Sequence, residues 1–320
     1  MEEVLRVVED TFYKSAITDL KSYLRENSHH KNWLMYSDYC IGDKNKPNDV
    51  VSFTLMPYDD YPNIIKERIS LLAPTDIKDK RKINPDFIAY LKERRLFHIS
   101  FILGSRKGLS QADGFVEKDL VMISLTKTCE MLDEWCDNTP SNAEYFKAVK
   151  EKLRIARGEL SKKSANYSLF RDVLLVSLLA GYISYMFTKF NKAKRFGWFS
   201  DRDKIIEVYD RLIADLFPMN HHSLCERDSI DSSGTEIAFG VPQSDKDGKG
   251  WYDEMNRLPD HIAGTLADWD IHNNLLTKSK FVEMMEDCIA DNSYLVIFRL
   301  VLEPKLFQCA RVLVSKRERV

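Results

Sequence analysis

Short runs of apolar residues alternate along the chain with longer stretches in which apolar residues recur at helical spacing. The short runs are rich in β-branched and aromatic residues and are bounded by turn residues, so they predict strands. They span Trp33–Asp38, Val50–Leu55, Leu96–Leu103, Arg195–Asp201, Thr235–Val241, Tyr294–Leu302 and Cys309–Val314. A polar turn with Gly, Asp, Asn and Pro joins the first two runs, which therefore predict a β-hairpin.

The stretches between these runs predict helices. They span Glu2–Arg25, Asn63–Leu72, Pro85–Arg94, Val116–Trp135, Asn142–Leu160, Tyr167–Phe190, Lys204–Leu216, Pro259–Trp269 and Lys278–Ala290. Strands separated by helices favour an α/β sheet with parallel members. We expect one domain over 1–320. Its parts are an N-terminal helix over 1–28, a helical insertion over 60–95, a helical region over 141–190 and a C-terminal extension over 278–320.

Composition narrows the class of protein. Hydrophobic residues make up 44% and charged residues 30% of the chain, which is typical of a globular protein. The net charge of −2 gives no sign of a strongly basic domain, so any surface that binds nucleic acid must be local. The six cysteines are scattered without close pairs, so we expect reduced thiols in a cytoplasmic protein. The uncharged segment Val173–Phe187 is shorter than the ~20 residues that cross a bilayer, so we expect a buried helix and no membrane association.

Two predicted strands end with the same pattern of an aromatic residue, a serine and an aspartate. One ends Tyr36-Ser37-Asp38 and the other Phe199-Ser200-Asp201. A carboxylate after an apolar strand is costly unless it is exposed or paired, and ligands of open α/β sheets bind at the carboxyl ends of strands. On neighbouring strands these aspartates would lie within reach of one Mg²⁺ or Mn²⁺ ion. The alternative is that each caps the turn or helix that follows.

A third acidic position lies in the predicted helix Pro259–Trp269. Asp260 falls in its first turn, and Asp268 follows eight residues later, so both can share one face of the helix. The small pair Ala263-Gly264 would let the helix lie close to the sheet and direct Asp260 at the strand ends. The alternative is an acid favoured by the helix dipole near an N-terminus.

Together these residues resemble the RNase H-like superfamily over roughly Trp33 to Trp269. In that superfamily the first acid lies in the first strand of a hairpin, the second ends a later parallel strand, and a C-terminal helix presents the last. The helix is similar to that of an uncharacterised bacterial family with an Asp-x-x-Ala-Gly motif. The resemblance implies an RNase H-like mixed sheet with flanking helices and helical insertions. It also implies that Asp38, Asp201 and Asp260 are catalytic and bind Mg²⁺ or Mn²⁺.

Further site residues follow from this resemblance. Asp203 and Asp268 are reserve metal ligands, and Arg202 and Lys204 are candidates to contact substrate phosphate. Classical members add a glutamate from the helix after the third strand. Either Glu130 or Glu134 could take that place.

The function expected from the resemblance is that of a metal-dependent nuclease or nuclease-like protein, in a bacterial defence or mobile-element setting. A near-neutral chain binds nucleic acid weakly alone, so we also expect a protein partner or a homo-oligomer. The alternative is a non-catalytic subunit that assembles through exposed aromatics such as Tyr58, Tyr61 and Trp251. A hydrolase of small molecules or nucleotides with the same acids is a third option.

Three further motifs are weaker candidates for a functional site. The loop Gly104–Gly108 contains Arg106 and Lys107 and could contact a phosphate, although it lacks the final Lys-Ser/Thr of a phosphate-binding loop. His221, His222 and Cys225 have metal-ligand chemistry, but a structural zinc needs four ligands. The basic run over 78–82 is expected to be a solvated loop.

Overall fold

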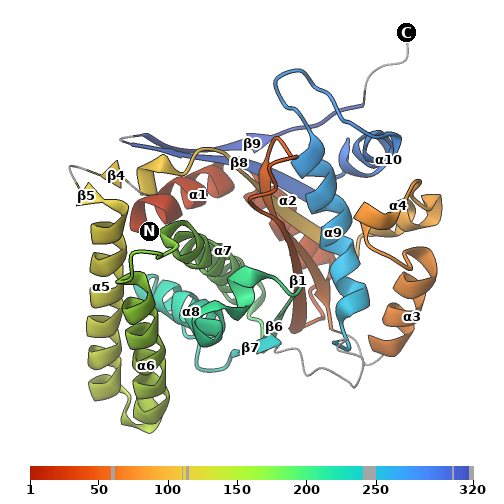
Figure 1. Ribbon diagram of the computed structural model, residues 1–320. Helices are drawn as coiled ribbons and strands as arrows, with labels where there is room; N and C mark the ends of the chain where they lie inside the picture. The colour runs from red at the N-terminus through yellow and green to blue at the C-terminus, as the bar shows by residue number, and fades with distance from the viewer. Residues whose placement is uncertain (59–61, 110, 113–114, 241–249, 305, 317–320) are drawn as a thin grey trace.

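The computed structural model describes residues 1–58, 62–109, 111–112, 115–240, 250–304 and 306–316 (Figure 1). A seven-stranded mixed sheet in the order β7-β6-β1-β2-β3-β8-β9 forms its centre. The strands are β1 (Asn32–Cys40), β2 (Asp49–Pro57), β3 (Phe97–Leu103), β6 (Arg195–Ser200), β7 (Glu236–Gly240), β8 (Leu295–Glu303) and β9 (Leu306–Val312), with β4 (Gln111–Ala112) and β5 (Phe115–Val116) as a separate pair. The predicted α/β class with a mixed sheet and flanking helices is confirmed.

Strand direction brings several chain segments to one edge of this sheet. β1, β2 and β3 pair in antiparallel fashion, β6 and β7 run parallel to β1, and β8 runs parallel to β3. The carboxyl ends of β1, β3, β6, β7 and β8 therefore lie at the same edge as the start of β2. In sheets of this kind that edge is where ligands bind.

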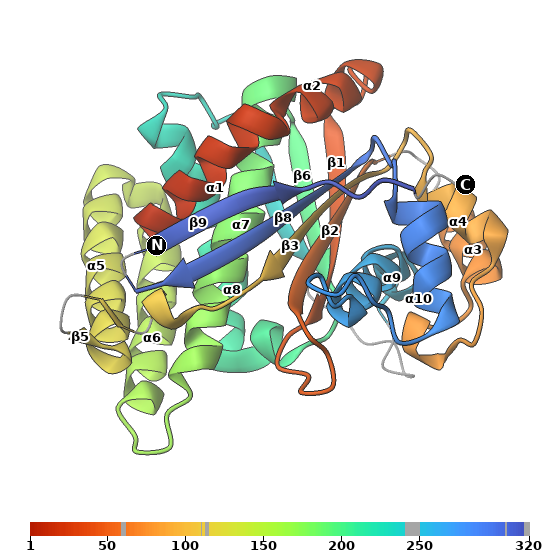
Figure 2. The same cartoon turned by 90° about the horizontal axis from the view of Figure 1, so that it is seen from above.

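Helices cover both faces of the sheet (Figure 2). One face carries α1 (Glu2–Ser15), α2 (Ile17–Glu26), α7 (Tyr167–Asn191) and α8 (Lys204–Arg227), with α5 (Glu117–Asn138) and α6 (Ala143–Leu160) packed outside α7 and α8. The other face carries α9 (Asp253–Asp268), α3 (Pro62–Leu72), α4 (Pro85–Leu91), α10 (Ser279–Glu283) and the π-helical segment η4 (Met284–Ile289). Short 3₁₀ turns are η1 (Ile77–Asp79), η2 (Lys107–Leu109) and η3 (Pro140–Asn142).

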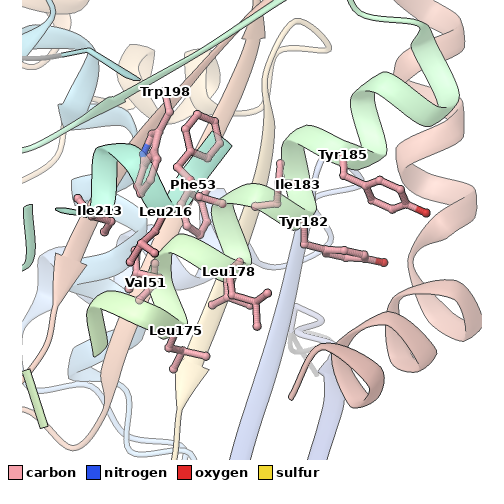
Figure 3. Packing of buried hydrophobic residues seen from close by; sticks show 14 of the residues in the cluster. Val51, Phe53, Leu175, Leu178, Tyr182, Ile183, Tyr185, Trp198, Ile213 and Leu216 are labelled. Carbon is pink, nitrogen blue, oxygen red and sulfur yellow. The ribbon is translucent and has the colours of Figure 1, made fainter. Parts of the chain in front are cut away.

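Helix α7 forms the centre of the larger core. Its residues Leu175, Leu178 and Ile183 lie in one cluster with Val51 and Phe53 of β2 (Figure 3). By length and composition it is the one helix among the described residues that could cross a membrane, and 83% of its most apolar window is buried inside the protein. The segment predicted to be a buried helix is therefore buried against the sheet.

Several boundaries differ from the prediction for local reasons. The N-terminal helix is two helices, because Ala16 leaves helical geometry at φ −130°. The helix predicted from Lys204 to Leu216 continues to Arg227 and contains Pro218. The predicted C-terminal extension supplies β8 and β9 to the main sheet. Two predicted features lie outside the described ranges, namely the last residue of the strand predicted over 235–241 and Tyr61.

The helix that carries Asp260 begins earlier than predicted. It starts at Asp253, so Pro259 and Asp260 lie near its middle rather than in its first turn. The prediction of Pro259 at the first helical position is wrong. An acid at Asp260 cannot be explained by the dipole at a helix N-terminus, because that effect fades within one turn.

Helix α8 contains a short left-handed segment. Tyr209, Asp210 and Arg211 have φ values of 53°, 53° and 56°. The left-handed conformation costs roughly 1–2 kcal/mol for each residue that is not glycine. Tyr209 is buried, and its ring packs edge-on against Phe170 at 5.5 Å, so side-chain packing holds this backbone in place.

This segment gives a test in which substitution by glycine should have opposite effects on stability at two positions. Asp210 is exposed, so Asp210→Gly should relieve left-handed strain and leave the free energy of unfolding unchanged or raise it by about 0.5–1 kcal/mol. The control Ala148→Gly lies at an exposed position in the regular helix α6 and should lower it by about 1 kcal/mol. Urea denaturation measures both. Equal destabilisation by the two variants would contradict the left-handed assignment.

Candidate active site

The repeated aromatic-Ser-Asp pattern arises because β1 and β6 are adjacent parallel strands in register. Tyr36 lies opposite Phe199, and Ser37 lies opposite Ser200. The backbone N–H of Asp201 donates to the carbonyl of Ser37 at 3.0 Å, which extends the pairing by one residue. Asp38 and Asp201 are therefore brought to neighbouring positions at the carboxyl ends of the two strands, as the pattern predicted.

The serines and the aspartates point to opposite faces of the sheet. On the α7 and α8 face, the Tyr39 hydroxyl lies 2.7 Å from Ser37 Oγ and 2.8 Å from Ser200 Oγ, and Trp198 Nε1 donates to Ser37 Oγ at 2.8 Å. This buried network fixes the two strand ends relative to each other. Because side chains alternate along a strand, Asp38 then faces α9.

Helix α9 lies alongside β1, with its first half at the end of β6 (Figure 1). The side-chain amide of the buried Asn256 binds the backbone at the end of β6. In the amide orientation that gives both its nitrogen and its oxygen a partner, it donates to the Phe199 carbonyl at 3.2 Å and accepts from the Asp201 N–H at 3.0 Å. Asp260 follows one turn later on the same side of the helix. Asp260 is therefore directed at the strand ends that carry Asp38 and Asp201.

The carboxylates are close enough to perturb one another. The pKa of Asp38 is raised well above its usual range by burial and by the negative charges of Asp260 and Asp201. Burial also raises the pKa of Asp201 to about 6, with repulsion from Asp76, Asp260 and Asp253 adding to the rise. Among the described residues, no basic side chain forms an ion pair with Asp38 or Asp201. The cluster therefore holds uncompensated negative charge.

Asp76 joins this cluster from the helical insertion, and sequence reasoning missed it. It lies directly before η1, in the basic linker that was predicted to be a solvated loop. One oxygen of Asp260 accepts the Ile77 N–H at 2.7 Å, so the insertion is tied to α9 beside the acids. No periodicity of the sequence places a linker against a distant helix, and only the contact with Asp260 reveals it.

A buried lysine holds the insertion in this position. Lys280 of α10 is 3% exposed, and its ammonium donates to the carbonyls of Ile77, Lys78 and Lys80. Gly264 of α9 faces the same turn, since an added Cβ would lie 2.8 Å from Ile77 Cγ2. Of the pair predicted to let α9 approach the sheet, Ala263 packs with sheet residues, whereas Gly264 admits the insertion.

The remaining predicted ligands have structural contacts instead. Asp203 caps α8, since its Oδ1 accepts the Ile205 N–H at 2.8 Å. Asp268 is buried, pairs with Lys46 at 2.6 Å and accepts the Thr277 N–H at 2.7 Å, so it is not directed at Asp38.

The predicted substrate contacts and the glutamates lie in different places. Arg202 and Lys204 are exposed directly after Asp201. Glu130 and Glu134 are exposed on α5, which lies on the opposite side of the sheet from α9 (Figure 2). The structure therefore does not bring either glutamate to the cluster.

The histidine–cysteine motif is part of the core. His221 Nδ1 lies 2.9 Å from Ser184 Oγ, and its Nε2 lies 3.6 Å from Cys225 Sγ. Both His221 and Cys225 are buried between α7 and α8, which explains the motif without a metal.

The acids at the strand ends fit a divalent cation in type and charge. Carboxylate oxygens are the donors that Mg²⁺ and Mn²⁺ prefer, and within the described ranges Asp38 and Asp201 form no ion pair with a basic side chain. As the side chains lie, no group of three or more His, Cys, Asp or Glu in the described ranges is spaced to hold a metal ion. Mutual repulsion keeps carboxylates apart, so shared coordination would require side-chain rotation.

Comparison with known proteins adds no identification. No family model matches the chain, and neither a curated protein nor a solved structure is similar to it. The geometry of the residues themselves is therefore the basis for a functional assignment.

The raised pKa of Asp201 predicts how stability depends on pH. The folded state holds this proton up to about pH 6, whereas an unperturbed aspartate releases it near 3.8. The stabilisation from the proton is therefore present at pH 4 and is lost as the pH rises to 6. Asp201→Asn should raise the free energy of unfolding by about 1–2 kcal/mol at pH 8, after allowance for partial exposure, and by clearly less at pH 5.

Asp268→Asn is the matched control for this measurement. Burial tends to raise the pKa of Asp268, but the bonds from Lys46 and Thr277 outweigh it and lower the pKa, so it is ionised at both pH values. Its loss should destabilise the protein by about 3 kcal/mol at pH 5 and at pH 8. Denaturant unfolding in EDTA measures both variants, and a destabilising Asp201→Asn at pH 8 would contradict the assignment of an uncompensated charge.

Proposed function

We propose that this protein is a metal-dependent phosphodiesterase of RNase H-like fold that acts on nucleic acid. The observation that carries the proposal is the convergence of Asp38, Asp201 and Asp260 at one edge of the sheet. Beside burial, the charges of Asp260 and Asp201 raise the pKa of Asp38, and the charge of Asp260 raises that of Asp201. Structural acids are normally paired with bases, whereas groups with perturbed pKa values in a cluster mark functional sites.

The topology supports the RNase H-like part of the proposal. Asp38 lies in the first strand of the β1–β2 hairpin, Asp201 ends the parallel neighbour β6, and Asp260 comes from the later helix α9. This is the order of acids that the resemblance implies. The long insertion between β2 and β3 departs from a minimal fold and adds Asp76 to the same cluster.

In the proposed site, Asp38, Asp201 and Asp260 would hold Mg²⁺ or Mn²⁺, and Asp76 would add a fourth carboxylate. When bound, such an ion supplies activation of water and stabilisation of the leaving oxygen in phosphodiester cleavage. The chain itself positions the acids: Asn256 fixes the end of β6, and the Ile77 N–H fixes one oxygen of Asp260.

Local features provide the contacts that a nucleic acid needs. Lys78 and Lys80 of the insertion are close enough to feel the charge of Asp260, and Arg202 and Lys204 are exposed beside Asp201. Trp251 is 46% exposed, and its ring lies 5.1 Å from that of Phe199, two residues before Asp201. An exposed indole beside basic side chains suits stacking on an unpaired base.

The test is cleavage of single- and double-stranded DNA and RNA in Mg²⁺, Mn²⁺ or EDTA. Asp38→Asn and Asp201→Asn should each lower the rate by more than the about 10- to 100-fold that outer-shell groups contribute at metal sites. Asp76→Asn should have a smaller effect, because Asp76 already forms an ion pair with Lys78 at 3.3 Å. Calorimetric titration with Mn²⁺ measures metal binding by the same variants.

The control is Glu130→Gln, which should cleave like the unmodified protein because α5 lies across the sheet from the acids. Cleavage that survives Asp38→Asn would overturn the site. Absence of both cleavage and metal binding in every condition would overturn the catalytic proposal and favour a non-catalytic subunit of a complex.

A further inference from the structure

A polar cavity lies at the same edge of the sheet, and none of the clustered acids lines it. Its volume is about 380 Å³. It is lined by the β1–β2 turn from Lys46 to Asp49, the end of β3 from Ile102 to Ser105, the loop from Asp270 to His272, and Arg299. It therefore opens past the C-terminal end of α9, where that helix stops covering β3 and β8.

Arg299 is the unusual residue of this cavity. It lies within β8, opposite Ile102 of β3 and Ala310 of β9, and it is half-buried. Ile297 on the same face of the strand belongs to an apolar cluster. Within the described part of the chain, the side chain of Arg299 forms no hydrogen bond or ion pair. A partly buried guanidinium without a partner is costly, and arginine is rarely buried unless paired.

The acids that line the cavity are already engaged elsewhere. Asp49 forms an ion pair with Arg106 and accepts the Gly42 N–H at 2.7 Å. Asp270 turns into its own loop, where it accepts the His272 N–H at 3.0 Å and bonds with Asn273. The remaining lining charge, Lys46, is paired with Asp268. Of the charged residues that line the cavity, Arg299 is thus the cation whose side chain is available to bind a ligand.

The lining also indicates the class of ligand. The volume is near the lower end of the range for small-molecule sites, about 300–1,000 Å³, which suits a small phosphate ester better than a polymer strand. Gly104 and Ser105 of the glycine-containing loop line the cavity, whereas Arg106 of that loop is committed to Asp49 and Asp172. A guanidinium fork matches the geometry of a phosphate.

We propose that this cavity binds a small phosphorylated molecule, with Arg299 as the residue that holds its phosphate. The site is separate from the acids of the proposed active site, so it stands whether or not the protein cleaves nucleic acid. Ser105 and the backbone at the end of β3 would contact the same ligand.

The experiment measures binding of ribose 5-phosphate, inorganic phosphate and ribose by calorimetry at constant ionic strength. The two phosphates should bind and ribose should not. Arg299→Met should weaken binding of ribose 5-phosphate by about tenfold or more, and Arg299→Lys by less, because charge-assisted hydrogen bonds to phosphate are lost. Arg154→Met, at an exposed position on α6, should bind like the unmodified protein.

Stability without ligand separates a binding role from a structural one. Since Arg299 has no partner, Arg299→Met should leave the melting temperature unchanged or raise it in the absence of phosphate. Failure of both phosphates to bind, equal binding by Arg299→Met, or a large loss of stability in that variant would each overturn the proposal. Binding of a 5′-phosphorylated oligonucleotide through Arg299 without binding of ribose 5-phosphate would overturn the small-molecule class. Asp38→Asn should not alter the binding of ribose 5-phosphate or inorganic phosphate.

Discussion

The acidic cluster depends on the contact of helix α9 with the ends of β1 and β6. Asn256 binds the backbone at the end of β6, and the next turn of the helix places Asp260 beside Asp38. Farther along, Ala263 and Ala267 pack against the sheet, so the helix axis stays close to it. Because a helix is rigid, this one contact fixes the direction of Asp260, the position of the insertion that bonds to it, and the point where the cavity beside Arg299 opens.

This contact carries an energetic cost in the absence of a cation. The strand ends collect negative charge that the described chain does not neutralise with ion pairs at Asp38 or Asp201, and their proton affinities rise as a result. Elsewhere the same fold pairs its buried charges, as in the bonds of Asp268 with Lys46 and of Asp172 with Arg106. Asp268 and Asp172 thus stabilise the fold through ion pairs, whereas Asp38 and Asp201 are held in place by the fold against mutual repulsion. Acids of the second kind are typical of functional sites.

Much of this arrangement could be predicted from the sequence, because strand and helix periodicities are local. Asp38 and Asp201 were found because in-register parallel strands give the same residue pattern twice. Asp76 could not be found, since its place depends on Lys280 and Asp260, about 200 positions away along the chain. The start of α9 was misplaced because Pro259 is favoured at the first helical position, yet here packing of the helix carries it inside.

The order in which the chain is synthesised gives the buried ammonium of Lys280 a further consequence. Lys280 follows Ile77, whose carbonyl it binds, by 203 positions. At about 5–20 residues per second, a ribosome makes the insertion roughly 10–40 s before the lysine that anchors it. Asp38 and Asp76 therefore leave the ribosome long before Asp260 and its anchor. The nascent chain, which emerges beside ribosomal RNA, cannot assemble the acids until Asp260 and Lys280 have also been made.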